Sequence, residues 1–193
     1  MSAAVTLPLD RESLVRAVRA GVSFDFLCFY GHKPSDDGEL TDACFSQWWD
    51  SPFDLDGVTY DTAEHWMMAS KATLFRDEEM LAQILVAPSP AAAKKLGRAV
   101  RNFDGALWGR HRFDLVTKGN VAKFSSTPEL KRHLLDTGDA ILVEAAARDT
   151  IWGVGLGASN PAARDPTRWR GSNLLGFALV RARHVLRGEL PAP

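Results

Sequence analysis

The sequence lacks the features that mark secreted, membrane-spanning or zinc-binding proteins. Its only cysteines, Cys28 and Cys44, are too few for a disulfide framework, and no CxxC pair is present. The longest apolar runs, such as NLLGFALV, fall far short of the ~20 residues that cross a bilayer. Asp10, Glu12 and Asp25 interrupt the N-terminal region where a signal peptide would be apolar. We therefore expect a cytoplasmic protein with no membrane span.

The chain also has no large excess of either positive or negative charge. The chain has 23 basic and 24 acidic residues and a net charge of -1, which predicts no broad basic surface for nucleic acid or anionic membrane. An anionic partner must therefore be bound locally. The histidines show no metal-ligand spacing, and neither a GxSxG elbow nor a Walker loop occurs. We expect no metal and no cofactor, and the pattern disfavours serine nucleophiles and ATP hydrolysis.

The elements that are present indicate a helix-rich chain with few strands. Serine or threonine followed by proline predicts helix starts at Ser89-Pro90 and Thr127-Pro128. Asp56-Gly57 predicts a tight hairpin turn between alternating apolar positions. Further apolar periodicity predicts helices over 9–20, 62–75, 106–124 and 173–190, and strands over 24–31 and 140–146. Because these elements do not alternate as βαβ units, we expect an α+β, mainly helical single domain.

The segment VTYDTAEHWMMASKATLF, residues 58–75, places two charges among bulky apolar side chains. Glu64 and Lys71 are seven residues apart and share one stripe of the predicted helix. Burying an unpaired charge is costly, so each must be paired, held in a pocket or solvent-facing. Glu64 could instead close a capping box with Asp61 as N-cap, and Lys71 could run along apolar surface to reach water. Both interpretations stay open at this level.

A second candidate constellation is VEAAARDTIWGVGLG, residues 143–157. An acidic residue at the end of a strand, then Trp152 and three alternate glycines, would let the backbone approach a flat ligand beneath an aromatic platform. The GxGxG spacing, without a helix after it, is not that of a dinucleotide loop. Trp152 could equally be a core tryptophan, and Asp149 could form an Asx turn.

Four ordered blocks carry a resemblance to a known family. They are DGVTYDTAEHWMMASKA, SPAAAKKLGR, AKFSSTPELKRHLLDTGDAILVEAAARDTIWGVGLG and DPTRWRGSNLLGFALVRAR. In this order and spacing they resemble the NADAR family, also called YbiA-like, over about residues 24–187. The resemblance implies an N-terminal helical extension at 1–23 and a family domain at 24–190.

The resemblance implies N-glycosidase chemistry on a ribosyl C–N bond. Two substrate groups are associated with the family: ADP-ribosylated guanine, as a nucleoside or in nucleic acid, and phosphoribosylamino-pyrimidine intermediates of riboflavin biosynthesis. A non-catalytic module that binds ADP-ribose or a nucleotide sugar is the alternative. The oligomeric state stays open. The resemblance assigns catalysis to Glu64, Lys71 and Asp149, and substrate contacts to Phe29, Tyr30, Trp108, Trp152, Gly153, Gly171 and Asn173.

Two positions depart from the family pattern. Many relatives have Ser-Asn where this chain has Ser46-Gln47, and some carry an aspartate within WGxG where Val154 stands here. A ligand contact by that asparagine is therefore not expected to carry over.

The chemistry agrees with the residues. Cleavage of a ribosyl C–N bond passes through an oxocarbenium-like state, which needs a nearby negative group, a proton for the leaving nitrogen and a positioned water. Glu64 and Asp149 can supply these, with one carboxyl kept protonated by repulsion and burial. Alternatively, Lys71 could attack a ring-opened sugar and form a Schiff base. The candidate partners for substrate phosphates are Lys123, Arg168 and Arg170.

Overall fold

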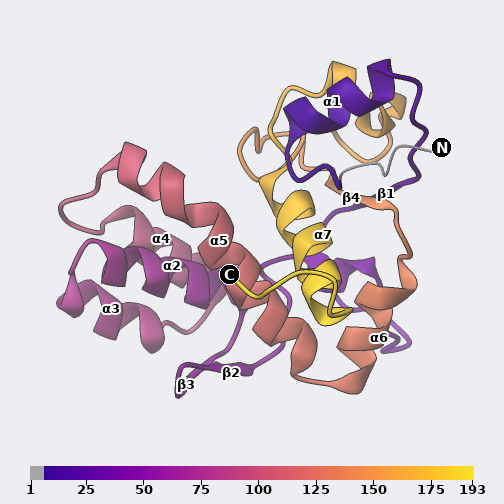
Figure 1. Cartoon of the computed structure of the whole chain (residues 1–193). Coiled ribbons are helices and arrows are strands. Elements are labelled where there is room, and N and C mark those ends of the chain that lie inside the picture. The colour runs from indigo at the N-terminus through magenta and orange to yellow at the C-terminus, as the bar shows by residue number, and fades with distance from the viewer. Residues whose placement is uncertain (1–6) are drawn as a thin grey trace.

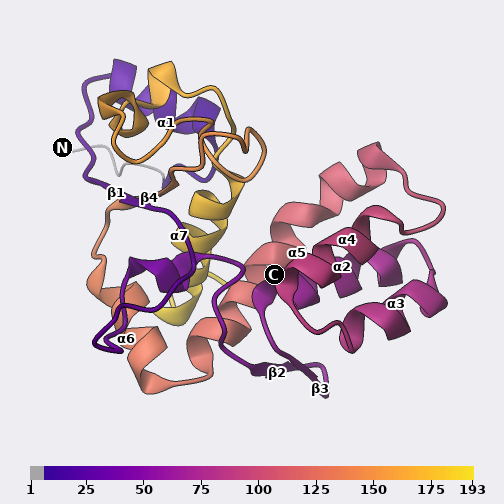
Figure 2. The same cartoon turned by 180° about the vertical axis from the view of Figure 1, so that it is seen from behind.

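The computed structural model describes residues 7–193, and residues 1–6 lie outside it. The long helix α5 crosses the middle of the molecule, with α2, α3 and α4 on one side and α1, β1, β4, α6 and α7 on the other (Figures 1 and 2). The described helices are α1 Arg11–Arg19, α2 Ala63–Leu74, α3 Glu78–Leu85, α4 Pro90–Arg98, α5 Gly105–Ser125, α6 Pro128–Asp136 and α7 Leu174–Leu186, with short 3-10 turns η1 Asp42–Phe45, η2 Pro161–Arg164 and η3 Pro166–Arg168.

The strands form two separate pairs. β1 (Phe26–Phe29) runs parallel to β4 (Ile141–Glu144), and β2 (Phe53–Leu55) is antiparallel to β3 (Val58–Tyr60). The turn of the second pair, Asp56-Gly57, has φ of 54° and 79°, as a tight hairpin requires. The α+β, mainly helical single-domain prediction is therefore confirmed.

The predicted helix starts are confirmed where the sequence has a hydroxyl before proline. Ser89 Oγ accepts the N–H of Ala92 at 3.2 Å, and Thr127 Oγ1 accepts that of Leu130 at 3.2 Å. Each hydroxyl satisfies an N–H that the first helical turn leaves free. Sequence periodicity did not predict α3, although Asp77 caps it by accepting the N–H of Met80 at 3.3 Å.

The predicted cap of α2 is wrong. Thr62, not Asp61, is the N-cap, and its hydroxyl accepts the N–H of His65. Thr62 has the extended backbone of a cap residue, φ -144° and ψ 162°. Glu64 is then the second helical residue, whereas a capping box needs the carboxylate at the third. The Glu64 side chain is free for another partner.

Two glycines let α4 and α5 approach α2 closely. A Cβ on Gly97 would lie 2.0 Å from Met68 Sδ, and one on Gly119 would lie 2.2 Å from Trp66 Cδ1. A larger residue at either position would require the Met68 or Trp66 side chain to move. The main core that results surrounds α2, α5 and α7.

A smaller core joins the N-terminal helix to the rest. Leu14 of α1 is fully buried with Trp169 and Phe177, and the Arg11 Nε donates to the carbonyl of Pro166 at 3.1 Å. The helix predicted at 9–20 is confirmed as α1, and it covers the segment that precedes α7.

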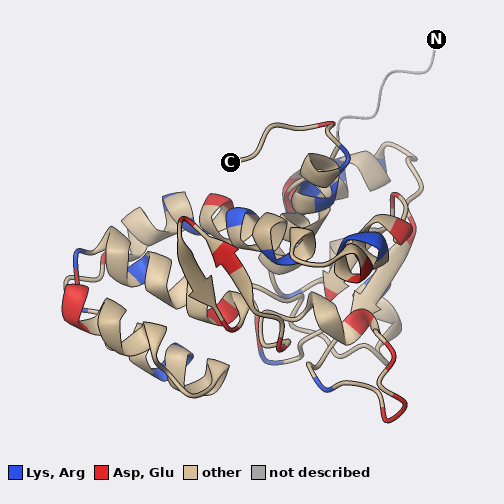
Figure 3. Ribbon diagram, turned by 90° about the horizontal axis from the view of Figure 1, so that it is seen from below, with Lys and Arg blue, Asp and Glu red and all other residues tan. Residues whose placement is uncertain are grey.

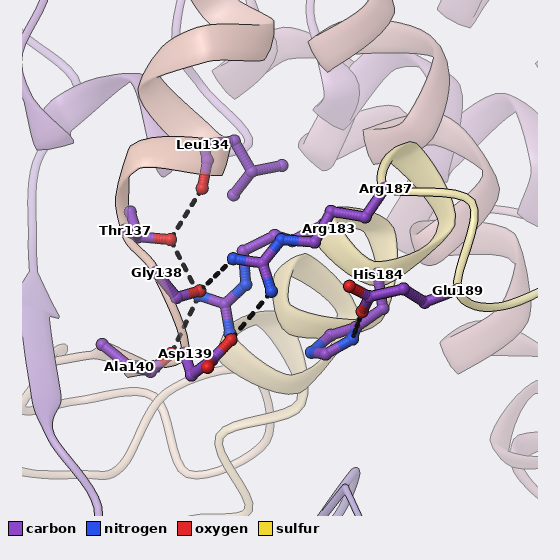
Figure 4. Close-up of polar contacts among 9 residues, drawn as sticks. All are labelled: Leu134, Thr137, Gly138, Asp139, Ala140, Arg183, His184, Arg187 and Glu189. Atoms are coloured by element: carbon purple, nitrogen blue, oxygen red, sulfur yellow. Dashed lines mark hydrogen bonds and ion pairs between the residues drawn. The ribbon is translucent and has the colours of Figure 1, made fainter.

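The end of α7 is tied to the turn that leads into β4 (Figure 4). Arg183 is fully buried, and its Nη1 donates to Thr137 Oγ1 at 2.7 Å and to the Ala140 carbonyl at 2.9 Å. Arg187 Nη1 donates to Asp139 Oδ1 at 2.8 Å. Burial lowers the pKa of Arg183 to about 10, with Arg187 as the next cause. These contacts fix the turn immediately before β4.

Candidate functional site

The parallel pairing of β1 and β4 brings their carboxyl ends together. Phe29 and Glu144 are register partners at that end, and the Phe29 carbonyl accepts the N–H of Ala145 at 2.9 Å. A hollow of about 580 Å³ opens there, within the size range of small-molecule pockets. It is referred to below as the Glu144 hollow, and its polar and aromatic lining includes Tyr30, His32, Lys33, Trp48, Lys94 and Glu144.

A second hollow of about 600 Å³ adjoins the first, because both are lined by Tyr30 and Lys94. Its other polar lining comes from the end of α4 and from the loop after β4. We name it the Arg148 hollow, and it adds Arg98, Arg148, Asp149 and Gly157. Each hollow therefore places one carboxylate, Glu144 or Asp149, among several cations.

Glu64 lies behind Trp48, which lines the Glu144 hollow. Its side chain is 2% exposed, and Oε2 accepts the indole N–H of Trp48 at 3.2 Å. Oε1 is buried without a hydrogen-bond partner among residues 7–193. Burial raises the pKa of Glu64 to about 7, while Lys94 is the largest influence in the opposite direction. The carboxyl can therefore gain or lose a proton near neutral pH.

Glu144 is the second carboxyl, and it is partly buried. It lines the hollow directly, and its Oε2 is buried without a partner in the described part of the chain. The pKa of Glu144 is raised to about 8. Burial is the largest cause, the charges of Asp149 and Glu64 act in the same direction, and Lys94 opposes them. Two carboxyls with raised proton affinity thus influence one another.

The lysine that faces this site is Lys94. It lies on α4 four residues before Arg98, so the two cations share one face of that helix. Lys94 Nζ is 5.6 Å from the centre of the Trp48 ring. It therefore supplies positive charge beside Trp48, Glu64 and Glu144.

Lys71 points elsewhere. Its Nζ donates to the carbonyl of Gly97 at 2.6 Å and lies 4.1 Å from the centre of the Phe103 ring. A cation at the last turn of α4 is favoured by the helix dipole. Burial lowers the pKa of Lys71, and Lys71 is absent from the charges that act on Glu64. The shared stripe of α2 did not bring the two side chains to one pocket.

Lys123 is also outside the hollows. It is fully buried, and its Nζ donates to the carbonyls of Cys44 at 2.6 Å and Ser46 at 2.7 Å. Burial lowers its pKa to about 7. These contacts tie α5 to η1 and leave the ammonium away from any surface where a phosphate could bind.

The loop after β4 is organised by Asp149. Its Oδ1 accepts the N–H groups of Ile151 at 2.9 Å and Trp152 at 2.8 Å, which is an Asx-type turn. Asp149 also lines the Arg148 hollow, so the turn does not remove it from the site. Trp152 is partly buried against the main core.

The glycines of this loop bring backbone close to backbone. A Cβ on Gly153 would lie 2.9 Å from the Glu144 carbonyl oxygen, and one on Gly171 would lie 2.2 Å from the Gly153 carbonyl oxygen. Asn173 is fully buried, and its Nδ2 donates to the Leu142 carbonyl at 2.9 Å. These residues were expected to contact substrate, but their contacts hold β4 and the loop together.

The remaining predicted residues divide between the hollows and other places. Phe29 and Tyr30 line the Glu144 hollow. Trp108 is 9% exposed within the main core, and Arg168 and Arg170 are exposed at the surface. Gln47 is buried and donates from Nε2 to Asn120 Oδ1 at 3.1 Å.

Sequence reasoning missed the residues that give the site its charge. Glu144 is the acidic residue at the end of the predicted strand, a position that parallel pairing places at the edge of the sheet. Lys94 and Arg98 are in the SPAAAKKLGR block, which was used only for the resemblance. Their i,i+4 spacing indicated a basic helix face, but no pattern indicated which partner that face meets.

Residues 7–193 contain neither a metal-binding cluster nor a helix that could span a membrane. Among residues 7–193, no group of three or more His, Cys, Asp or Glu side chains is arranged to hold a metal ion. None of the helices in that same range combines the length and apolarity needed to cross a membrane.

Comparison with known proteins identifies the family. The family model described as NADAR domain matches residues 28–187, which is most of the chain and all of the elements that form the two hollows. The chain belongs to the NADAR family. The match begins after α1, at the second half of β1.

Several NADAR relatives carry functional names. The chain is 43% identical over 144 residues to N-glycosidase R617 of Acanthamoeba polyphaga mimivirus, covering 72% of this chain and 85% of the relative. It is 31% identical over 159 residues to N-glycosidase YbiA of Escherichia coli K12, covering 82% and 88%. The NMR structure of the Escherichia coli protein YbiA is similar to this fold with a TM-score of 0.66 and 30% identity, over 91% of this chain and 94% of that one.

A plant relative is named for riboflavin biosynthesis. The chain is 29% identical over 144 residues to the chloroplastic riboflavin biosynthesis protein PYRR of Zea mays. The match covers 71% of this chain but only 21% of the plant protein.

Proposed function

We propose that this protein is an N-glycosidase that hydrolyses a ribosyl C–N bond. The observation that carries the proposal is a pair of neighbouring carboxyls, the buried Glu64 and the partly buried Glu144, each with a buried oxygen that lacks a partner among the described residues. Glu144 lines a hollow of about 580 Å³ together with Lys94. Buried polar atoms are nearly always satisfied, so an unpartnered carboxyl oxygen needs an explanation, and a bound substrate supplies one. The names of the R617 and YbiA relatives support the same chemistry.

The chemistry requires negative charge near the anomeric carbon as the C–N bond breaks. An oxocarbenium-like centre is stabilised by a carboxylate, and the leaving nitrogen needs a proton. Glu64 can supply the charge when it is ionised. Because its pKa is raised to about 7 by burial, it can also accept a proton from an attacking water near neutral pH.

The substrate class that fits is a ribosyl compound bearing phosphate. The Arg148 hollow offers Arg98 and Arg148, and Lys33 lines the Glu144 hollow, so phosphate has cationic partners on either side of Lys94. These replace Lys123, Arg168 and Arg170 as the phosphate partners we favour. ADP-ribosylated guanine and phosphoribosylamino-pyrimidines both carry such groups.

Free nucleosides or single strands fit the charge distribution better than duplex nucleic acid. Acidic and basic residues are interspersed over the ribbon in Figure 3, in keeping with the net charge of -1. The two hollows have cations of their own, Lys33, Lys94, Arg98 and Arg148. Local cations serve a small anionic group, whereas duplex binding relies on many phosphate contacts.

Two routes to the same products remain, direct hydrolysis and a covalent route through lysine. In the covalent route a ring-opened ribosyl imine is attacked by an uncharged amine, the substrate nitrogen leaves, and water releases the sugar from the Schiff base. Lys71 was the sequence candidate, but its Nζ is held by the Gly97 carbonyl. If the route operates, we assign the amine to Lys94, which lines both hollows.

The experiment that tests the function is mass spectrometry of products. Wild type and Glu64→Gln are incubated separately with ADP-ribosylated guanosine and with a phosphoribosylamino-pyrimidine. We expect release of the free base or free pyrimidine by the wild type from at least one substrate, and a loss of about 100-fold or more in the variant.

The controls separate catalysis from binding. Substrate binding by Glu64→Gln is measured in parallel, because loss of a catalytic carboxyl should leave binding largely intact. Binding by the wild type without cleavage of either substrate would instead support a non-catalytic nucleotide-sugar binding module.

A further inference from the structure

We propose that Glu144 is the acid that protonates the leaving nitrogen, and that Glu64 is its partner carboxylate. The inference rests on the proposed N-glycosidase function and assigns the two halves of the acid–base chemistry within it. The sequence placed an acidic residue at the end of this strand but gave Glu144 no catalytic role, and the assignment comes from its place at the end of β4.

Access favours Glu144 as the group that meets the substrate. Glu144 lines the hollow, whereas Glu64 is 2% exposed and lies behind Trp48, whose indole N–H its Oε2 accepts. A carboxyl that donates its proton must come within hydrogen-bond reach of the leaving atom. The buried Oε2 of Glu144 has no partner in the described chain that would compete for that proton.

The charges around Glu144 keep it protonated at neutral pH. The charges that act on it are Asp149 from the loop, Glu64 from α2 and Lys94 from α4, and His32 and Lys33 from the segment after β1 line the same hollow. Burial and the two carboxylates raise the pKa of Glu144 to about 8, and Lys94 only partly opposes them. The pKa of Glu64 is raised less, to about 7, which agrees with Glu144 as the protonated member of the pair.

The backbone of Glu144 is held from both sides. Its N–H donates to Asn173 Oδ1 at 3.0 Å, and its carbonyl accepts the N–H of Val154 at 3.0 Å. Gly153 packs so closely on that carbonyl that no side chain fits there. This explains why Gly153 and Asn173 do not line either hollow: they fix the position of Glu144.

The step balances without any further reactant. Water adds to the anomeric carbon and passes a proton to the Glu64 carboxylate. The C–N bond breaks with its electron pair on nitrogen, and that nitrogen takes the proton of Glu144. A proton then returns from Glu64 to Glu144, so the net change is substrate plus water to free sugar and free amine.

The test compares two leaving groups in the full-length protein. An N-ribosyl pyridinium leaves as a neutral base and needs no proton, whereas the nitrogen of a ribosylated guanine or ribosylamino-pyrimidine does. We expect Glu144→Gln to lower kcat on the second class by about 100-fold or more, and on the pyridinium by no more than about threefold. Glu64→Gln should lower both.

A pH profile and a second variant complete the test. The wild-type rate on the proton-requiring substrate should fall above about pH 8, where Glu144 loses its proton, and Glu144→Gln should lack this alkaline decline. Glu144→Asp, which keeps an acid, should recover part of the rate if Glu144→Gln is poorly folded.

The outcomes are distinct. Equal losses on both leaving groups, or a full rate in Glu144→Gln with the ribosylated guanine or pyrimidine, would overturn the assignment while leaving the N-glycosidase function in place. A wild type that cleaves no member of either class would overturn the function and the assignment together.

Discussion

The Glu144 hollow and the Lys123 site both bury charge, but they satisfy it differently. Lys123 is fully buried and directs its ammonium at two carbonyl oxygens, 2.6 and 2.7 Å away, on Cys44 and Ser46. In the hollow, Glu64 and Glu144 each keep a buried oxygen without a partner in the part of the chain that the structure describes.

The difference separates a structural charge from a functional one. A buried charge with its hydrogen bonds made holds two segments together. A buried carboxyl with an unmatched oxygen is costly in the free protein, and that cost is explained if a substrate atom or a proton completes it. A shifted pKa alone does not separate the two cases, because burial shifts the pKa of Glu64, Glu144 and Lys123 alike.

The largest effect should come from the lysine that belongs to the hollow. We expect Lys94→Met to lower kcat by about 100-fold, because the variant removes the cation beside both carboxyls, and Lys71→Met to change kcat by no more than about threefold. The kcat of both variants is measured by steady-state kinetics, with a ribosyl substrate that the wild type cleaves. Lys71→Met is the matched control, since it removes a lysine that is also partly buried.

Borohydride trapping is a second way to compare Lys94 with Lys71. If the covalent route operates, reduction during turnover should add the sugar mass to a peptide containing Lys94. Sugar mass on Lys71, or a larger loss of kcat in Lys71→Met than in Lys94→Met, would contradict the assignment of Lys94 to the site. Lys71 would then be the active-site lysine.

The next effect is on stability. Lys123→Met removes the donor from two carbonyls, and we expect the free energy of unfolding to fall by about 2–3 kcal/mol. Urea denaturation measures it. Lys118→Met on the same helix is the control: Lys118 pairs with the exposed Asp56 at 2.7 Å, and its loss should cost less than about 1 kcal/mol. Equal changes in the two variants would mean that the Lys123 contacts are not stabilising.

The fold was accessible from sequence wherever local chemistry sets the structure. Ser89-Pro90, Thr127-Pro128 and Asp56-Gly57 marked helix starts and a hairpin because caps and tight turns depend on adjacent residues. The cap of α2 was assigned one residue early because Asp61 and Thr62 are both competent caps. Which of the two caps the helix depends on where the backbone changes from extended to helical.

The site was less accessible because it depends on contacts between distant segments. Helical periodicity placed Glu64 and Lys71 on one stripe, but seven residues of α-helix extend about 10 Å along the axis. The two side chains therefore meet different neighbours, Trp48 for Glu64 and Gly97 for Lys71. Which acid joins Glu64 depends on the pairing of β1 with β4, which no local pattern specified.

The smallest expected effect is on the free energy of unfolding, and it comes from the cost of burying the Glu64 carboxyl. This effect depends on pH. The pKa of Glu64 is raised in the folded protein to about 7 from an unfolded value near 4.5, so the folded state holds its proton more tightly. Stability from this group is complete below the unfolded pKa and is lost as pH rises through about 7. Glu64→Gln cannot ionise, so it should match the wild type near pH 4.5 and exceed it at pH 8.5.

We expect a gain on the order of 1–2 kcal/mol at the higher pH, less than the full pKa shift implies because Trp48 still donates to the replaced side chain. Urea denaturation at both pH values measures it, with Glu129→Gln, at the first turn of α6, as the exposed control. A variant that is inactive yet more stable at pH 8.5 is what an unsatisfied functional carboxyl requires. A variant that is less stable at both pH values would instead place Glu64 with Lys123, among the charges that hold the fold together.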